Sequence, residues 1–353
     1  MRLTFNPLEF DMFIGLDVDS KSYAITFLDQ EAKGHSLKIP AQPQVLHGYF
    51  QKRFPQKRLL FAYEAGPTGY QLYDYLGKQN QKCMILHPAG IPKSTQGRVK
   101  NNRLDSQKIA EQLKTGQLQG IRVPSPAYRQ LRHLTDLRAQ YSQRQIQIKQ
   151  KIKSLLLFEN ISLPALQGTA WNRPFRQALT RVSVNETVRF KLDLLLRDLE
   201  DTRIRVSTVL RQMRQFVGQE KQIQQSIDYL QSIPGFGFIV STYLLARVGD
   251  PSQLKDVREL AAFCGLVPSE NSTGENISRG SITRTGDAIS RSLLVQAAWI
   301  AIRKDTELYQ FYSRIRAKRG KQHGSQIAIV AVARKLTQRA YRVLKDQRPY
   351  VIH

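Results

Sequence analysis

Two short apolar runs, Met12-Phe-Ile-Gly-Leu-Asp17 and Arg58-Leu-Leu-Phe-Ala-Tyr-Glu64, decide the fold of the first third of the chain. Runs of this length are typical of buried strands, and each ends in a carboxylate where a strand would reach the edge of its sheet. We therefore predict two core strands that end at Asp17 and Glu64. Their surroundings indicate both the architecture of this part of the chain and a first candidate site.

The segments around this pair alternate between strand and helix patterns. Three more strands are predicted at residues 23–28, 35–39 and 82–87, and two helices at residues 43–53 and about 68–78. The resulting order is three strands, a helix, a strand, a helix and a strand. This is the order that opens a ribonuclease-H-like layered sheet, in which the first and fourth strands are neighbours.

Three carboxylates are expected to meet at one edge of this sheet. Asp17 and Glu64 end neighbouring strands, and Asp105 begins a predicted helix that follows a basic loop. Carboxylates that converge in this way can hold two Mg²⁺ ions, which clamp the attacking and leaving oxygens of a phosphodiester. The alternative is that the strand-end carboxylates are only turn residues or helix caps.

The charge of the chain indicates a polyanionic partner. Its 353 residues carry 54 Lys and Arg against 28 Asp and Glu, a net charge of +26, and a protein that neutralises phosphates gains affinity from counterion release. The sequence has two widely spaced cysteines, no apolar run long enough to span a membrane and no signal-peptide pattern. We therefore expect a soluble, intracellular, nucleic-acid-binding protein with no membrane partner.

Helical periodicity of apolar residues predicts two long helices, at residues 128–158 and about 186–232, with a connector near 160–185. Two long helices joined in this way indicate an antiparallel coiled-coil arm. The first helix is strongly basic, as is the segment 303–345, so both are expected to hold nucleic-acid backbones. On the first helix the candidate nucleic-acid-binding residues are Arg129, Arg132, Arg138 and Lys151.

The segment Pro234-Gly-Phe-Gly237 precedes an apolar helix and is similar to the hairpin of helix-hairpin-helix modules. In such a hairpin the backbone N–H groups near Gly235 and Gly237 would face phosphate at a helix N-terminus. An ordinary glycine-rich turn between two helices is the alternative.

A polar segment further along contains the candidate nucleophiles. Ser272 and Thr273 stand directly before Gly274, and three arginines follow them. A hydroxyl beside phosphate-binding arginines can act as a covalent nucleophile, although the same residues also suit an ordinary polar loop. The arginines are Arg279, Arg284 and Arg291.

Five segments, taken in order, resemble insertion-sequence transposases that have an N-terminal Asp-Glu-Asp-Asp (DEDD) domain of ribonuclease-H-like, or RuvC-like, fold and a C-terminal serine-containing transposase domain. This group includes the pilin-gene invertases and the bridge-RNA-guided recombinases. With the helices between them, the segments cover nearly the whole chain. They lie at residues 14–17, 63–69, 100–105, 233–237 and 261–294.

The resemblance implies a site-specific recombinase that cuts and rejoins DNA with Mg²⁺ as its cofactor. A structured noncoding guide RNA would select target and donor DNA. The chain would act as a homo-oligomer, a dimer to a tetramer, in the bacterial cytoplasm at the nucleoid. The family's serine would become linked covalently to DNA, in a composite site completed by the acidic domain of another subunit.

Individual residues follow from the same resemblance. Asp17, Glu64 and Asp105 would match three of the four acidic positions of the family, and Asn102 stands at the fourth. Asn can ligate Mg²⁺ through its carbonyl oxygen but adds no charge. The family's serine falls on Ser272 or Thr273, and Ser272 is favoured because its Cβ is unbranched and the hydroxyl is less hindered.

The combined prediction is an α/β domain followed by all-α parts: a RuvC-like domain at 1–122, the coiled-coil arm at 123–232 and a mostly helical transposase domain at 233–353. The predicted function is RNA-guided recombination through a serine–DNA intermediate. Two alternatives stay open. One is a RuvC-like hydrolytic nuclease or junction resolvase that uses water in place of serine. The other is a catalytically impaired nucleic-acid-binding homologue, which Asn102 motivates.

Overall fold

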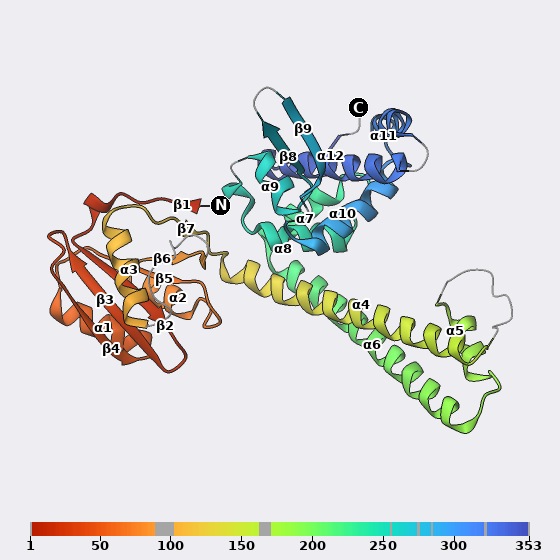
Figure 1. The fold of residues 1–353 in the computed structure, drawn as a ribbon, viewed down its shortest axis with the longest axis horizontal. Coiled ribbons are helices and arrows are strands. Elements are labelled where there is room, and N and C mark those ends of the chain that lie inside the picture. The colour runs from red at the N-terminus through yellow and green to blue at the C-terminus, as the bar shows by residue number, and fades with distance from the viewer. Residues whose placement is uncertain are drawn as a thin grey trace. The chain divides into compact units, whose positions relative to one another are not determined.

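The chain divides into two structural units, Met1–Val123 and Pro124–His353 (Figure 1). The first unit has α/β layers, and the second is mostly helical. In this computed structural model the described residues are 2–88, 102–161, 171–254, 256–273, 276–283, 285–320 and 323–351. No helix within these ranges has an apolar stretch long enough to cross a membrane.

A seven-stranded mixed sheet forms the first unit, in the order β1-β7-β6-β5-β2-β3-β4. The central strand β2 pairs antiparallel with β3 and parallel with β5, so the first and fourth predicted strands are neighbours, as the sequence predicts. The short strands β1 and β7 have no counterpart in the sequence prediction. The strands are β1 Arg2–Leu3, β2 Met12–Val18, β3 Ser22–Asp29, β4 Gly34–Pro40, β5 Leu59–Glu64, β6 Lys82–Leu86 and β7 Gly120–Ile121.

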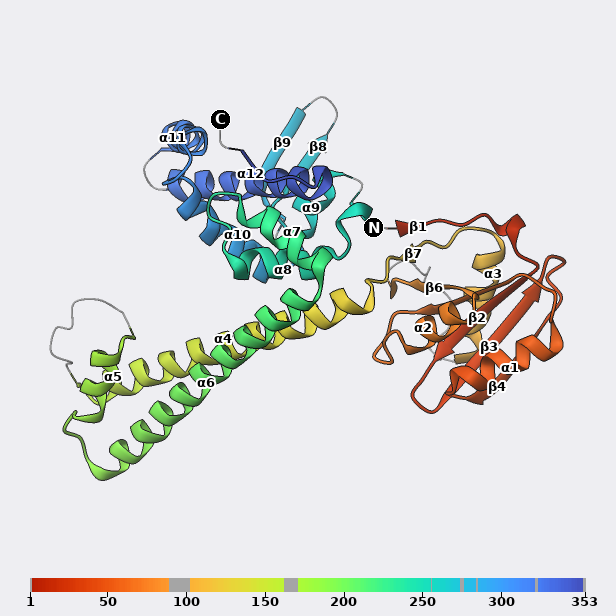
Figure 2. The same cartoon turned by 180° about the vertical axis from the view of Figure 1, so that it is seen from behind.

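Helices cover both faces of this sheet (Figures 1 and 2). Ile14 and Leu16 of β2 pack on one face with α1 and α2, whereas Phe13 packs on the other face with Ile109 of α3. Since successive strand residues point to opposite faces, the almost unbroken apolar run of β2 reflects burial from both sides. The helices are α1 Pro43–Arg53, α2 Gln71–Lys78 and α3 Asn102–Lys114, and a 3₁₀ turn spans Pro7–Glu9.

Two long helices, α4 and α6, pack along each other in the second unit (Figure 1). Their shared core includes Ile152 of α4 with Leu192 and Leu199 of α6. Both lie in stretches where the sequence predicts long helices, whereas the coiled-coil supercoil stays a prediction. The bounds are α4 Pro126–Phe158, α5 Arg173–Thr180 and α6 Glu186–Gln219.

The single helix predicted at about 186–232 is wrong, because two helices occupy this stretch. Helix α6 ends at Gln219 and α7 spans Lys221–Gln231, with Glu220 between them at φ −106° and ψ 86°, outside the helical region. The break redirects the chain, so that the buried residues Ile223 and Ile227 face a core shared with α8 (Phe238–Val248) and α12 (Gly324–Asp346). Burial of this apolar face outweighs continuation of the helix.

The rest of the second unit is a helical domain with one β-hairpin. The hairpin, β8 paired antiparallel with β9, occupies the segment that the sequence could also assign to a polar loop. Its residues are mostly polar, so the apolar alternation that signals a buried strand is missing. The bounds are α8 Phe238–Val248, a 3₁₀ turn at Pro251–Gln253, α9 Val257–Phe263, β8 Pro268–Thr273, β9 Asn276–Ile282, α10 Ala288–Ala301, α11 Thr306–Arg319 and α12 Gly324–Asp346.

Candidate functional sites

Asp17 and Glu64 lie side by side in sequence register on neighbouring parallel strands. Leu16 of β2 pairs with Tyr63 of β5, and Asp17 and Glu64 are the next residues of each strand. Leu16 and Tyr63 belong to the core under α1 and α2, so alternation places both carboxylates on the opposite face, which α3 covers. Asp17 is half-buried and Glu64 is exposed.

Gly15 lets α3 approach β2 closely and thereby places Asp105. A Cβ on Gly15 would lie 2.1 Å from the backbone oxygen of Ser106 and 2.6 Å from the backbone nitrogen of Ala110. The Ser106 hydroxyl lies 3.0 Å from the buried Thr26 hydroxyl, and Thr26 pairs with Gly15. Asp105 precedes Ser106 in the first turn of α3 and is half-buried.

The direction of α3 brings its first turn toward the carboxyl end of β2. Leu113, near the end of the helix, shares a core with Phe13, whereas Ser106 lies over Gly15. The helix therefore runs opposite to β2, and its start is nearest to the strand end that carries Asp17. Register and packing thus bring the three predicted carboxylates to one face and one end of the sheet.

Gly15→Ala tests this packing. We expect the substitution to destabilise the protein by about 3 kcal/mol, because the added methyl group meets backbone atoms of α3 that cannot rotate away. The measurement is urea unfolding, with Gly48→Ala as the control, since a Cβ at Gly48 meets nothing within 4 Å. Equal stability of the two variants would mean that α3 does not pack directly on β2.

The acidic edge suits Mg²⁺ in donor type but is not a preformed metal site. Carboxylate and amide oxygens are ligands that Mg²⁺ accepts, and α3 covers the face on which the strand-end carboxylates lie. Among the described residues, however, no three Asp, Glu, His or Cys side chains are grouped closely enough to hold a metal ion. Asn102 is the first residue of α3, and the structure describes its backbone but not its side chain.

The candidate nucleophiles occupy the last two positions of β8. Ser272 pairs with Ile277 of β9 and Thr273 pairs with Asn276. The side chains of Ser272, Thr273 and Arg279, and the whole of Gly274 and Arg284, lie outside the described residues.

Backbone contacts hold the base of this hairpin. Gly286 has φ +145°, and a Cβ there would lie 2.5 Å from the backbone oxygen of Phe263. The next residue, Asp287, donates its N–H to the same oxygen at 2.9 Å, and its carboxylate caps α10 by accepting the N–H of Ser290 at 3.0 Å. Arg291 donates to the backbone oxygen of Cys264 at 3.4 Å.

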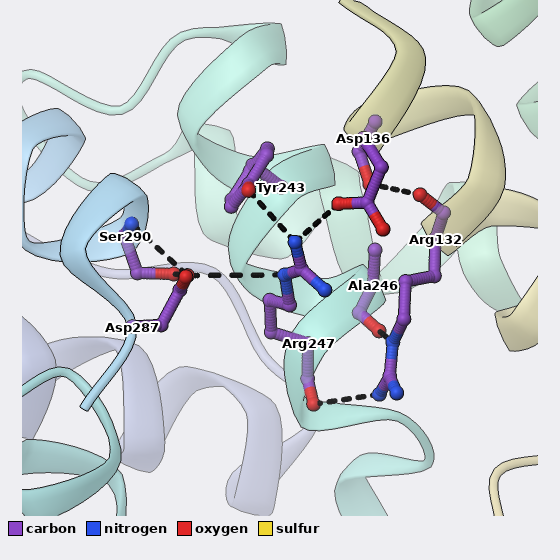
Figure 3. Close-up of polar contacts among 8 residues, drawn as sticks. Arg132, Asp136, Tyr243, Ala246, Arg247, Asp287 and Ser290 are labelled. Atoms are coloured by element: carbon purple, nitrogen blue, oxygen red, sulfur yellow. Dashed lines mark hydrogen bonds and ion pairs between the residues drawn. The ribbon is translucent and has the colours of Figure 1, made fainter. Parts of the chain in front are cut away.

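Arg247 of α8 contacts residues of α4 and of the N-terminus of α10, next to the base of the hairpin (Figure 3). Its guanidinium donates to Asp136 of α4 and to the Tyr243 hydroxyl of α8 at 2.9 Å, and its Nε lies 3.8 Å from the Asp287 carboxylate. Burial lowers the pKa of Arg247, but the bond to Tyr243 and the nearby carboxylates outweigh burial and raise it. This cation links α4 to the base of the hairpin.

The sequence patterns do not single out Arg247, Asp136 or Asp287. Asp136 is the one acidic residue among the basic residues of segment 121–155, and a lone carboxylate in such a segment is a usable signal for an internal ion pair. Asp287 precedes the apolar helix α10 and has the residue type of an N-cap. Nothing in the local sequence pairs either of them with Arg247.

Arg247→Gln is expected to lower the free energy of unfolding by about 3 kcal/mol, because it leaves two partly buried carboxylates without their cation. Chemical denaturation of the full chain measures this loss. Arg258→Gln, which removes an exposed arginine of α9, is the control. A loss no greater than that of the control would show that the cluster contributes nothing to stability.

The predicted phosphate-binding residues of α4 differ in their surroundings. Arg132 donates to the backbone oxygens of Ala246 and Arg247, both at 3.3 Å, and so completes the end of α8 (Figure 3). Burial lowers the pKa of Arg138, whose Nε is buried without a hydrogen-bond partner among the described residues. Arg129 is half-buried, and Lys151 is exposed to solvent.

The two glycines of the predicted phosphate hairpin also differ. Gly235 has φ +88°, and a Cβ there would lie 2.2 Å from the backbone oxygen of Ala297, so close packing against α10 requires this glycine. Gly237 is the N-cap of α8, and a Cβ there would meet nothing within 4 Å. Of the two, Gly237 is the one at an open helix N-terminus.

Two family models match successive parts of the chain. Residues 14–160 match a DEDD-type model from the IS110 group, described as "Transposase". Residues 227–313 match the model described as "Transposase IS116/IS110/IS902 family". The first match contains the acidic edge and Asp136, and the second contains the hairpin together with Arg247, Tyr243 and Asp287.

Curated relatives agree with both matches. The transposase for insertion sequence element IS1533 of Leptospira borgpetersenii is 23% identical over 96% of this chain and 97% of its own length. The transposase for IS1111A of Coxiella burnetii is 23% identical over 80% of this chain and 75% of its own length. The pilin gene-inverting protein of Moraxella bovis is 29% identical over 39% of this chain and 43% of its own length. The chain belongs to the IS110/IS116 family of transposases, with a DEDD-type N-terminal domain, and is an enzyme of DNA recombination and transposition.

Proposed function

We propose that this transposase is an RNA-guided, site-specific recombinase that joins DNA through a serine–DNA intermediate. The observation that carries the proposal is the hairpin β8–β9, which presents Ser272 and Thr273 at its outer end while contacts at α9 and α10 hold its base. A nucleophile needs such a fixed support, because misplacement by about 1 Å lowers rates strongly.

The proposed step at the hairpin is a transesterification. The Ser272 oxygen attacks a DNA phosphorus, forming a Ser–O–P bond, while the bond from phosphorus to the 3′ oxygen breaks. The serine proton leaves to solvent, and the departing oxygen gains a proton to become a free 3′ hydroxyl. Arg279, Arg284 and Arg291 follow the serine in sequence and would stabilise the charge that develops on the phosphate oxygens.

The acidic edge would hold Mg²⁺ through Asp17, Glu64 and Asp105, with the Asn102 carbonyl as a further oxygen donor. Bound Mg²⁺ would supply positive charge to phosphate oxygens. The protein's own part is to keep these oxygens on one face, which Gly15 secures by fixing α3 against β2. In the proposed tetramer or dimer, this domain completes the serine site of another subunit.

The guide RNA and the two DNA substrates would contact basic side chains of the coiled-coil arm and the C-terminal domain, at the nucleoid. Lys151→Gln is expected to flatten the dependence of log K on log salt by roughly one unit, because one phosphate contact is lost. Binding titrations over a salt series measure this slope. Arg132→Gln is the contrasting variant, since that side chain bonds α8. An unchanged slope for Lys151→Gln would exclude a phosphate contact there.

Denaturing gels test the intermediate directly. Purified protein with its copurified RNA and a labelled DNA site should give a covalent protein–DNA adduct, and sequencing the copurified RNA should recover one structured transcript. A specific transcript without an adduct would favour a hydrolytic RuvC-like nuclease or junction resolvase. Binding with neither adduct nor cleavage would favour the catalytically impaired nucleic-acid-binding homologue. The observation behind this alternative is Asn102, which stands where the family has an acidic residue.

A further inference from the structure

A cavity of about 480 Å³ lies between the last turns of α12 and the residues that follow that helix. We name it the C-terminal pocket and define it by Lys335, Gln338 and Arg342 of α12 together with Arg348 and Tyr350. Its volume falls in the range of pockets that hold small organic ligands. The acidic edge, the hairpin and the Arg247 cluster contribute none of these lining residues.

A buried ion pair supports one wall of the C-terminal pocket. Arg339 donates to Asp305 at 2.6 Å, with 8% and 1% of the two side chains exposed. Arg339 also donates to Glu307 at 2.7 Å, and Lys335 donates to the same carboxylate. The charges of Arg339 and Lys335 are therefore largely balanced within the protein.

Tyr350 is fixed against this wall. The Arg339 guanidinium lies over the Tyr350 ring, 4.6 Å from the ring centroid. Its backbone N–H donates to the Ser232 hydroxyl at 2.7 Å, which attaches the segment after α12 to the end of α7. The pocket therefore contains a positioned aromatic ring.

Arg342 and Gln338 are the uncommitted polar groups of the pocket. They are one helical turn apart on the same face of α12, and both are exposed. Within the described ranges, neither has a hydrogen bond or an ion pair. Arg348 is exposed as well and bonds Asp346 at the surface at 3.2 Å.

We propose that the C-terminal pocket binds one unpaired nucleotide of a nucleic-acid strand. Arg342 would bind its phosphate, Gln338 would hydrogen-bond an edge of the base, and the Tyr350 ring would contact the face of the base. An aromatic ring beside a cation and an amide matches a nucleotide better than it matches the duplex backbone. The inference rests on the proposed function for the nucleic-acid partner and adds a site that reads a single strand.

Fluorescence anisotropy with short oligouridine and oligothymidine probes tests the pocket in the full chain. Arg342→Gln and Tyr350→Leu should each weaken binding about tenfold, the effect of losing a phosphate contact or a stacked base. Tyr350→Phe keeps the ring and should bind as the unaltered protein does. Arg316→Gln removes an exposed arginine of α11 and is the matched charge control. The two probes distinguish an RNA ligand from a DNA ligand.

Equal effects of Arg342→Gln and Arg316→Gln on both probes would overturn the proposal. A second measurement guards against misfolding of the Tyr350 variant: ultraviolet cross-linking of 4-thiouridine or bromodeoxyuridine probes to the unaltered protein. Cross-links in the peptide that contains Tyr350 support the pocket, and cross-links confined to other peptides contradict it. Recombination that persists while these cross-links are absent would refute the pocket and leave the proposed function intact.

Discussion

Asp17→Ala is expected to abolish recombination, with a loss of at least about a hundredfold, while RNA binding stays intact. Asp17 is the last residue but one of β2 and lies in register beside Glu64, on the face that α3 covers. Removing one oxygen donor there weakens the proposed Mg²⁺ site and the stabilisation of charge on the reacting phosphate. A plasmid recombination assay in Mg²⁺ and recovery of the copurified RNA measure the two properties separately.

Asp19→Ala is the matched control for this prediction. Asp19 lies two residues further along and is exposed, and its carboxylate bonds the neighbouring Ser20 backbone at 2.7 Å. Its loss should leave recombination unchanged. Asn102→Asp should tighten Mg²⁺ binding in a titration if Asn102 occupies the fourth acidic position. Normal recombination by Asp17→Ala would remove this edge from the active site.

Ser272→Ala should eliminate both the covalent adduct and strand exchange, with RNA and DNA binding retained. A methyl group cannot attack phosphorus, so the loss should reach the detection limit of the assay. Denaturing electrophoresis of labelled DNA detects the adduct, and gel-shift titration measures binding. Retained binding is the essential control, since an unfolded hairpin would also give no adduct.

Thr273→Ala is the companion variant, because the family's serine falls on Ser272 or Thr273. Since a single hydroxyl makes the attack, one of the two substitutions should eliminate the adduct and the other should spare it. Loss in Thr273→Ala alone would move the nucleophile by one residue without changing the chemistry. An adduct in both variants would exclude either hydroxyl as the attacking group.

The elements from β2 to β6 of the first unit could be predicted from the sequence because their signals are local, whereas the two-residue strands β1 and β7 could not. The apolar run at 12–17 is buried from both sides and therefore reads clearly as a strand, and the strand order follows from the pattern of the surrounding elements. The placement of Asp17 and Glu64 on the same face then needs only the pleat of two neighbouring strands. The role of Gly15 depends on tertiary packing, which composition and spacing do not reveal.

The second unit shows where local signals fail. Apolar periodicity continues through Glu220, so the break between α6 and α7 depends on contacts with α8 and α12 that are distant in sequence. The hairpin of β8 and β9 is mostly polar, so the sequence lacks the apolar alternation that would predict its strands. Arg132 has the sequence context of a phosphate-binding residue, yet its hydrogen bonds go to residues more than a hundred positions away.

The pairing of β1 with β7 has a consequence for how this protein can be rearranged. Arg2 lies opposite Ile121 and Leu3 lies opposite Gly120, so the strand that enters the sheet and the strand that leaves it are adjacent. A module whose ends meet can be exchanged between chains, or inserted into a surface loop, without threading or long linkers. A chimera that replaces residues 2–121 with the equivalent module of a relative therefore has both ends of the exchanged segment next to each other, at the same edge of the sheet.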